Sequence, residues 1–327
     1  FQEHSQSRTQ ICNITVGGLN RNGEDASNEL TYLILHAVGL LSIPEPHVTF
    51  RWNPGTPRWA LLKAIETNVK TKGGLPQFIS DLHVVQSWTD RGAPVEEARD
   101  WYCAGCVNPQ LPNSMHYSAG GPVNVPLILD LVLHRGIAPR TGKQIGIDTG
   151  DPQTFDTFRD LLNAFKKQHE FIFNRIAWLC SLTWEQEELH MRQPFISSIM
   201  PGCMERGKDS MCRGPKNFNL VFGDRGIVDT ADSLIAIKKL VFDESKLTIA
   251  ELLQTLDSNF ENERGEEIRQ MCLAAPKFGN DVDEADSMVR EIGNFSGHVI
   301  SSQKHPKGTY PMRAYRSGLA WHYFGGK

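Results

Sequence analysis

The pattern of apolar and polar positions along the first part of the chain predicts strands and helices in alternation. Residues 12–19 alternate β-forming side chains before a glycine pair, which predicts a strand followed by a turn. Helical spacing of apolar residues then predicts a helix over 30–41, with Asp25 as its N-cap and Pro44 at its end. The apolar residues expected on its buried face are Leu30, Leu33, Ile34, Ala37, Val38 and Leu41.

The next segments repeat this alternation. A strand is expected at 48–52, a helix from Pro57 to about Lys70, and a further strand within 75–88. Strands that alternate with helices in this way favour an α/β fold with largely parallel strands. A short helix over 94–99 then leads into a loop that contains cysteine, glycine and proline.

The second half of the chain is predicted to be mainly helical. One expected helix begins at Pro126, and others cover 155–182, 230–242, 248–260 and 282–300. Residues 201–226 are rich in Gly, Cys, Arg and Lys and lack periodicity, so a long loop is expected there.

The charge balance excludes some classes of partner. The 327 residues include 34 Lys and Arg against 38 Asp and Glu, a formal net charge of −4, without a long run of like charges. A nucleic-acid face or a basic membrane-binding patch is therefore not expected. The longest apolar runs fall well short of the ~18 residues that span a bilayer. The polar N-terminus lacks an initiator Met and a signal-peptide core, so the chain is expected to be cut from a longer one.

The cysteines predict reduced thiols in a cytoplasmic protein, because seven in a chain this long are too few, and odd in number, for a disulfide scaffold. Cys180 and Cys272 fall on helical core patterns and are expected to pack, whereas Cys203 and Cys212 flank a charged loop and are expected to face solvent. Cys103 lies three residues before Cys106, a redox or half-zinc spacing. No second such pair completes a metal site, so no metal is expected.

Cys106 lies in a loop within residues 97–121, between Gly105 and a Val-Asn-Pro turn. Free cysteines are usually buried small hydrophobes. Gly105 and Pro109, however, mark a break in regular structure, where functional residues tend to occur. The local sequence therefore leaves both a reactive thiol and an idle one open.

Five blocks of sequence resemble the glycyl radical enzymes, in the order in which that family has them. They read NITVGGLNRNGEDASNELTYLIL, VEEARDWYCAGCVNP, IGIDTGDPQTF, ADSLIAIKKLVF and APKFGNDVDEAD. The resemblance implies an α/β fold that is part of a ten-stranded barrel with surrounding helices. It implies that residues 1–327 are a single domain from the interior of that barrel, without its N-terminal part and its C-terminal glycyl radical domain. It also implies that Cys106 is the thiyl-radical cysteine, which takes hydrogen from the substrate.

The family's radical glycine lies near the C-terminus in an Arg-Val-x-Gly-Tyr-like motif, which this sequence lacks. Gly318 lies in a segment of another type and is not expected to replace it. The resemblance therefore implies no bound cofactor in this chain and a glycyl radical on a glycine outside it. A radical S-adenosylmethionine iron–sulfur activase would install that radical. A homodimer of catalytic subunits, with room for small accessory subunits, is also implied.

The residue two positions after the cysteine bears on the type of reaction. The family's dehydratases, C–N and C–S lyases and arylacetate decarboxylase carry a glutamate there, which moves protons. This chain has Asn108, whose amide forms hydrogen bonds but exchanges no proton at neutral pH. Pyruvate formate-lyase uses two adjacent cysteines, whereas Gly105 precedes Cys106 here. These differences favour hydrogen abstraction from a hydrocarbon followed by addition to fumarate, as in the alkylsuccinate and benzylsuccinate synthases.

The residues expected to bind substrate beside Cys106 are Asn108, Gln110, His116 and Tyr117. No arginine lies between Cys106 and Gly120, so His116 or Arg213 would have to bind a fumarate carboxylate. Two alternatives stay open: a dehydratase, C–N or C–S lyase or decarboxylase with a displaced acid, and a non-catalytic half-barrel. His116 and Tyr117 could also be ordinary loop residues, and Asn108 could simply stabilise the turn.

Overall fold

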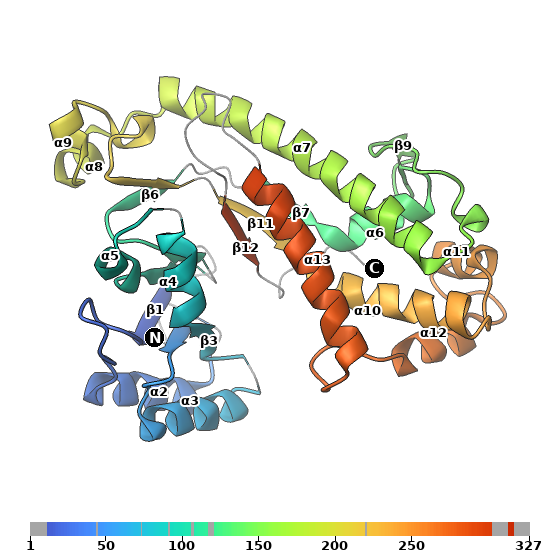
Figure 1. Ribbon diagram of the computed structural model, residues 1–327, viewed down its shortest axis with the longest axis horizontal. Helices are drawn as coiled ribbons and strands as arrows, with labels where there is room; N and C mark the ends of the chain where they lie inside the picture. Colours follow the sequence, from blue (N-terminus) through green and yellow to red (C-terminus); the bar gives the residue numbers. More distant parts are fainter. Residues whose placement is uncertain are drawn as a thin grey trace. The chain divides into compact units, whose positions relative to one another are not determined.

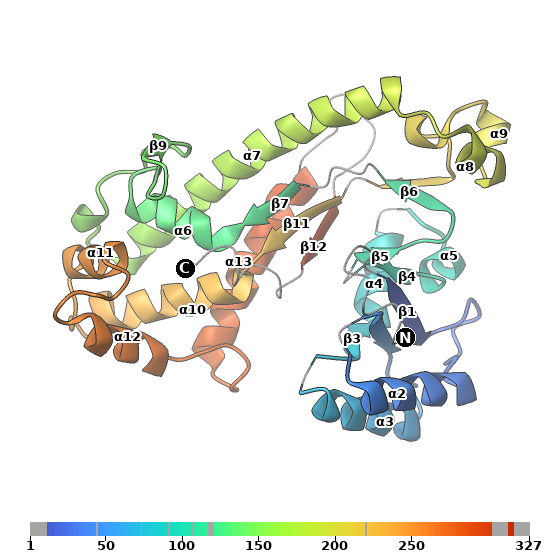
Figure 2. The same ribbon diagram turned by 180° about the vertical axis from the view of Figure 1, so that it is seen from behind.

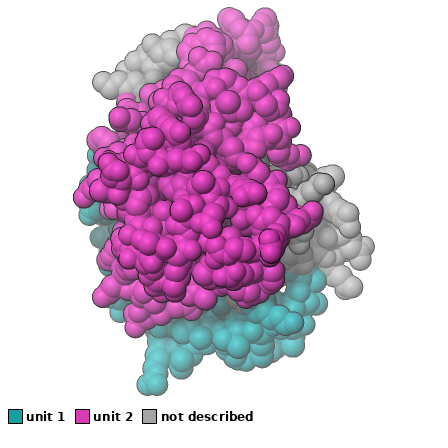
Figure 3. All heavy atoms as spheres, turned by 90° about the vertical axis from the view of Figure 1, so that its right-hand side faces the viewer, with its two compact units in different colours: residues 1–115, 193–218 teal, residues 116–192, 219–327 magenta. Residues whose placement is uncertain are grey.

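The computed structural model describes residues 12–43, 45–72, 74–90, 92–105, 108–116, 121–219, 221–302 and 313–316. The chain divides into two compact units, which Figure 3 colours separately. Unit 1 comprises residues 1–115 and 193–218, and unit 2 comprises residues 116–192 and 219–327. Each unit is therefore built from two separate stretches of the sequence.

Unit 1 contains a parallel sheet of three strands. β1 (Asn13–Gly17), β2 (His47–Trp52) and β3 (Gln77–Ser80) pair in the order β1-β2-β3. α2 (Glu29–Leu41) connects the first two strands, α3 (Arg58–Lys70) connects the next two, and the helices lie side by side (Figure 1). The predicted alternation of helices with parallel strands is confirmed in this part of the chain.

A hydrophobic core joins this sheet to its two helices. Its buried side chains are Val16, Leu35, Val38, Val48, Phe50, Ala60, Ala64 and Leu75. The alternation of side chains along β2 places Val48 and Phe50 on the same face, as expected for a strand that is packed against helices.

The N-terminus of α2 differs from the prediction. Asn28, not Asp25, is the N-cap: its side chain accepts a hydrogen bond from the N–H of Thr31 at 3.1 Å, and the Thr31 hydroxyl accepts one from the N–H of Asn28 at 3.3 Å. The predicted buried face is also wrong in part, because Leu30 is 62% exposed whereas Leu35 is fully buried. α2 is apolar around most of its circumference, so the spacing alone cannot select the face that packs.

The rest of unit 1 follows the sheet and returns after residue 192. Its further elements are α4 (Asp81–Thr89), α5 (Val95–Arg99), β4 (Tyr102–Ala104), β5 (Asn108–Gln110), α8 (Pro194–Ile199), α9 (Cys203–Arg206) and the 3-10 helix η2 (Ser210–Cys212). β6 (Ser114–His116) and β10 (Asn217–Asn219) lie where the chain passes from one unit to the other. The strand predicted within 75–88 is thus a short strand followed by a helix. The long loop predicted for 201–226 contains regular elements.

Unit 2 contains a second parallel sheet, which the sequence pattern does not predict. β7 (Gly121–Asn124), β11 (Val221–Arg225) and β12 (Arg313–Arg316) pair in the order β12-β11-β7. These strands are short, and β7 and β11 contain glycine or proline. Neither length nor alternation therefore marks them in the sequence.

Helices make up most of unit 2 (Figure 2). They are α6 (Val125–Leu133), α7 (Phe158–His190), α10 (Ile227–Ile237), the π-helix η3 (Lys238–Asp243), α11 (Ile249–Asp257), α12 (Gly265–Ala274) and α13 (Asp283–Ser302). Shorter elements are the antiparallel pair β8 (Ile137–Ala138) and β9 (Lys143–Gln144) and the 3-10 helix η1 (Pro152–Thr154). α7 runs beyond its predicted end at residue 182, and the helix expected over 230–242 begins earlier and ends in a π-helix.

The described strands form five sheets, of which the largest have three strands. The α/β character of the prediction is confirmed, but a ten-stranded barrel is not seen within the described ranges and stays a prediction. Among the described helices, none is both long and apolar enough to cross a membrane.

Candidate active site

The candidate active site is the hairpin formed by β4 and β5. The two strands pair antiparallel, with Tyr102 opposite Gln110, Cys103 opposite Pro109 and Ala104 opposite Asn108. Residues 105–107 connect the strands, and Gly105 adopts a left-handed φ of +60°, a conformation that favours glycine. Cys106 and Val107 lie outside the described residues. The predicted radical cysteine is therefore the middle residue of a three-residue connection between two paired strands.

The two faces of the hairpin have different surroundings. Cys103 is 2% exposed and belongs to a hydrophobic cluster with Val84, Trp88, Ala98, Trp101 and Leu111. Because side chains alternate along a strand, Asn108 and Gln110 lie on the face of β5 opposite to that of Pro109, the partner of Cys103. The structure thus brings two of the predicted substrate-binding residues together on one face and assigns Cys103 to packing.

Both amide side chains on this face are buried. Gln110 is 1% exposed, and its Oε1 accepts a hydrogen bond from the Ser114 hydroxyl at 3.3 Å. Asn108 is 9% exposed, and its Oδ1 accepts no hydrogen bond from the described part of the chain. An amide can orient a bound group through hydrogen bonds, but it cannot act as a proton donor or acceptor in catalysis at neutral pH.

A buried ion pair fixes the segment that leads into β4. Nε of Arg51 lies 2.7 Å from Oδ1 of Asp81, and both side chains are almost completely buried. The same carboxylate oxygen accepts a hydrogen bond from Nε1 of Trp101 at 2.8 Å, and the Arg51 guanidinium lies 4.6 Å from the centre of the Trp101 ring. Arg51 also donates to the carbonyls of Trp101 (2.9 Å), Arg99 (2.6 Å) and Leu19 (3.1 Å).

These contacts connect the hairpin and the segment before it to all three strands of the parallel sheet. Arg51 is the fifth residue of β2, Asp81 directly follows β3, and the N–H of Cys103 donates to the hydroxyl of Thr15 in β1 at 2.9 Å. Ligand sites of open α/β sheets commonly lie outside the carboxyl ends of the strands. Sequence reasoning missed Arg51 and Asp81, although each was recognisable as a charged residue near the end of a predicted strand.

The other predicted site residues are only partly accounted for. His116 belongs to β6, but its side chain lies outside the described part of the chain, as does the whole of Tyr117. Arg213 follows η2 with a left-handed φ of +61°. The predicted pairing of His116 or Arg213 with a substrate carboxylate remains a prediction.

Two of the other cysteines, Cys180 and Cys203, are buried. Cys180 is buried, as predicted, and burial raises the pKa of its thiol. Cys203 is 2% exposed, so its predicted solvent-side position is wrong. Burial raises the pKa of the Cys203 thiol, and the nearby Asp209 and Glu205 raise it further. A raised pKa keeps a thiol protonated and therefore unreactive as a nucleophile.

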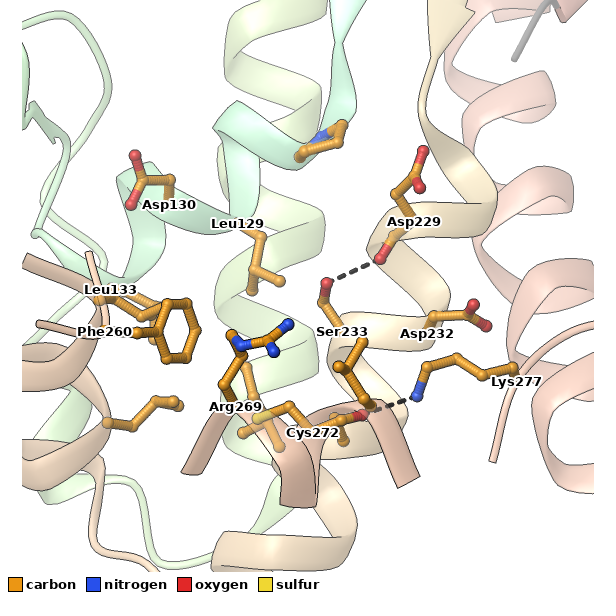
Figure 4. A pocket seen from close by; sticks show the side chains of 16 residues that line it. Leu129, Asp130, Leu133, Asp229, Asp232, Ser233, Phe260, Arg269, Cys272 and Lys277 are labelled. Carbon is orange, nitrogen blue, oxygen red and sulfur yellow. Dashed lines mark hydrogen bonds between the residues drawn. The ribbon is translucent and has the colours of Figure 1, made fainter. Parts of the chain in front are cut away.

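A pocket of about 510 Å³ lies among α6, α10, α11 and α12 of unit 2 (Figure 4). Its walls are mainly apolar and include Leu129, Leu133, Ile237, Leu252, Leu256 and Leu273. Its polar groups are paired within the fold: Arg269 binds Glu266 through two hydrogen bonds of 2.7 and 2.8 Å, and Lys277 donates to two backbone carbonyls at 2.8 Å. Cys272 lines the pocket, and burial raises the pKa of its thiol. The polar groups of this pocket therefore serve contacts within the fold, and the pocket contains none of the predicted site residues.

Comparisons with known proteins agree with the sequence blocks. Residues 2–318 match the family described as pyruvate formate lyase-like. The chain is 34% identical to trans-4-hydroxy-L-proline dehydratase of Clostridioides difficile over 293 residues, which cover 89% of this chain and 37% of the relative. It is 35% identical to isethionate sulfite-lyase of Oleidesulfovibrio alaskensis over 288 residues, which cover 86% of this chain and 34% of the relative.

A solved structure of a dehydratase also matches this chain. The crystal structure of hydroxyproline dehydratase from Clostridioides difficile, with trans-4-hydroxy-L-proline bound, matches with a TM-score of 0.82 at 32% sequence identity. The match covers 97% of this chain and 40% of that one. The chain spans about a third of the length of the curated relatives. These relatives are named as a dehydratase and a sulfite-lyase, so the expected addition to fumarate finds no support among them.

Proposed function

Because this chain belongs to the pyruvate formate-lyase-like family of glycyl radical enzymes, we propose that it is part of a glycyl radical eliminase with Cys106 as its thiyl carrier. The observation that carries the proposal is the β4–β5 hairpin, whose two strands pair on either side of residues 105–107 and whose entry segment is bound by Arg51 near the carboxyl end of β2. The dehydratase and sulfite-lyase names of the relatives support elimination as the reaction class.

The proposed reaction is a sequence of hydrogen-atom transfers around one bond cleavage. The Cys106 thiyl takes a hydrogen atom from a substrate carbon and becomes a thiol. The resulting carbon radical loses HX: the leaving group X departs from the neighbouring carbon with the bonding electron pair, and the proton comes from the hydroxyl or amine on the radical carbon. The product radical then takes the hydrogen atom back, which restores the thiyl. The face of β5 that carries Asn108 and Gln110 would orient the substrate beside the sulfur.

The radical itself would come from outside this chain. We propose that a glycine elsewhere in the catalytic subunit holds the resting radical and that a radical S-adenosylmethionine activase installs it. We further propose that units 1 and 2 belong to one domain within a barrel and that the subunit forms a cytoplasmic homodimer, with small accessory subunits as an optional addition.

Addition of a hydrocarbon radical to fumarate is the second candidate. The neutral side chain of Asn108 favours it, because addition requires no group that donates or removes a proton. The two functions differ in one simple requirement: addition consumes fumarate in equal amount to the hydrocarbon, whereas elimination proceeds without it.

The test uses the intact catalytic protein with its activase under anaerobic conditions. The substrates tested are hydroxylated compounds, among them a diol and a 2-hydroxyalkanesulfonate. We expect the protein to cleave at least one of them without fumarate. Cys106→Ala should abolish turnover, whereas Cys103→Ala, which alters a packing residue of the same hairpin, should retain it. Turnover that survives Cys106→Ala would overturn the thiyl assignment, and strict dependence on fumarate would favour addition.

A further inference from the structure

The helices α2 and α3 expose an apolar surface on their sides away from the sheet. Their inner sides belong to the hydrophobic core of unit 1, where Leu35 and Ala60 are fully buried. Residues at intervals of three, four or seven lie along one side of a helix, and six apolar residues at such intervals follow the outer sides. They are between 45% and 71% exposed: Leu30, Leu33 and Leu40 of α2, and Leu62, Ile65 and Val69 of α3.

The outer sides of the two helices form one surface of substantial size. Each helix has 13 residues and is therefore ~20 Å long. The helices lie side by side, so that together they present roughly 400 Å². Apolar patches of this size on soluble proteins often mark interaction sites. Helical spacing predicts that Leu30 and Leu33 are buried, and unit 1 itself does not bury them.

The charges at this surface are divided between the two helices. α2 contains one acidic residue and no Lys or Arg, whereas α3 contains three Lys or Arg and one acidic residue. Glu29 lies one turn before Leu33, and Arg58 lies one turn before Leu62. Both charged side chains are exposed, and neither forms an ion pair within the part of the chain that the structure describes. The outer side of α2 is therefore complementary in charge to that of α3.

The direction of the helices determines how two such surfaces can face each other. Both helices connect neighbouring parallel strands and pack on the same side of the sheet, so they run in the same direction. A two-fold axis parallel to them would place α2 of one copy on α3 of a second copy, with the first turns at the same end. Glu29 of each copy would then lie beside Arg58 of the other. A two-fold axis across the helices would instead place α2 on α2, without this pairing.

We propose that the outer sides of α2 and α3 form the contact between two copies of the catalytic subunit, with α2 of each copy packed on α3 of the other. The proposal rests on the homodimer proposed above and assigns a surface to it. The six apolar side chains supply the buried centre of the contact. The two symmetric contacts between Glu29 and Arg58 select the orientation, because every contact occurs twice in a two-fold interface.

The first experiment measures the Kd of the dimer by sedimentation of the intact catalytic protein over a range of concentrations. Leu33→Glu places a carboxylate in the apolar centre of the contact and should raise the Kd at least about 100-fold. Leu189→Glu is the matched control, because Leu189 of unit 2 is 62% exposed and lies outside this surface; it should leave the Kd unchanged.

Two outcomes of this experiment would overturn the proposal. One is an unchanged Kd for a Leu33→Glu protein whose circular dichroism shows that it is folded. The other is a Leu33→Glu protein that unfolds at lower urea concentration as a monomer while its Kd stays the same, since the surface would then be covered within a single subunit.

The second experiment tests the pairing of the charges between copies. Glu29→Arg brings two cations together and Arg58→Glu brings two anions together, so each variant should dimerise about tenfold more weakly. An equimolar mixture of the two variants should recover the original Kd, because each copy then supplies the charge that the other lacks. Such recovery cannot arise within one subunit, and a mixture that dimerises no better than the single variants would overturn the proposed orientation. Neither experiment requires the radical or a substrate, so a negative result leaves the eliminase reaction untouched.

Discussion

Replacing Arg51 with methionine should destabilise unit 1 far more than the loss of one ordinary salt bridge. The side chain of Arg51 is 8% exposed and that of Asp81 is fully buried, so the substitution leaves an uncompensated carboxylate in the interior. It also removes donors from the carbonyls of Leu19, Arg99 and Trp101. Breaking a buried pair in this way typically costs about 3–5 kcal/mol.

The measurement is urea unfolding of the 327-residue chain, followed by tryptophan fluorescence, because Trp101 lies against the Arg51 guanidinium. With a urea dependence of about 2 kcal/mol per molar, the transition that reports unit 1 should shift by about 2 M. The matched control is Arg21→Met, which removes an exposed ion pair with Asp100 at 3.2 Å. That change should cost about 1 kcal/mol or less.

Equal shifts for Arg51→Met and Arg21→Met would refute the assignment of the buried pair as the main support of the hairpin. The double variant Arg51→Met/Asp81→Leu adds a second criterion. Replacing both buried charges by apolar groups removes the unpaired carboxylate, so it should recover part of the stability lost in Arg51→Met. In the intact activated protein, Arg51→Met should also lower turnover, because Arg51 holds the backbone that leads into β4.

Three further predictions concern other positions. Burial lowers the pKa of His169 to about 3, so the stability that depends on its neutral form is full above its ordinary pKa of 6.5 and is lost as the pH falls. The free energy of unfolding should therefore be about 2 kcal/mol lower at pH 5 than at pH 7. His169→Leu should remove this dependence on pH. Hydrogen bonds that His134 donates to Asp130 raise the pKa of His134 to about 9. Its contribution to stability is therefore full below pH 6.5 and is lost as the pH rises through 9. His134→Gln should abolish a loss of about 1 kcal/mol in that window, measured by thermal unfolding. Gly18→Ala should lower the free energy of unfolding of unit 1, measured by urea unfolding, by about 2 kcal/mol or more. The φ of Gly18 is +85°, and the added Cβ would lie too close to the side chain of Arg51. Gly142→Ala is the control and should cost less, because no atom lies within 4 Å of the added Cβ.

The sequence predicted the parts of the fold that local patterns determine. The alternation of strands and helices over residues 12–70 was strong enough to predict parallel pairing, and the shared blocks led to the family. The Arg51–Asp81 pair was not predictable in the same way. These residues are 30 positions apart and meet only because β2 and β3 pair in register, which is a property of the assembled sheet.

Two errors have other physical causes. The buried face of α2 was wrong in part because apolar residues surround most of that helix, so its periodicity does not distinguish the packed side. The sheet of β7, β11 and β12 was missed because its strands are four or five residues long and come from distant parts of the sequence. At Asn108 the residue type, an amide that transfers no proton at neutral pH, follows from the sequence alone. Its burial and its unpaired oxygen, however, depend on the packing around β5.

The discontinuous composition of unit 1 has a consequence for biosynthesis. Lys216 forms an ion pair with Glu97 of α5, and Asn217 donates to the carbonyl of Pro112 at 3.3 Å, so the segment 193–218 completes the surroundings of the hairpin. A ribosome releases this segment only after it has made residues 116–192, which belong to the other unit. During translation of residues 116–192, the cysteine hairpin therefore lacks the contacts that the segment 193–218 makes beside it. Neither unit could be moved into a different gene as one uninterrupted stretch of coding sequence.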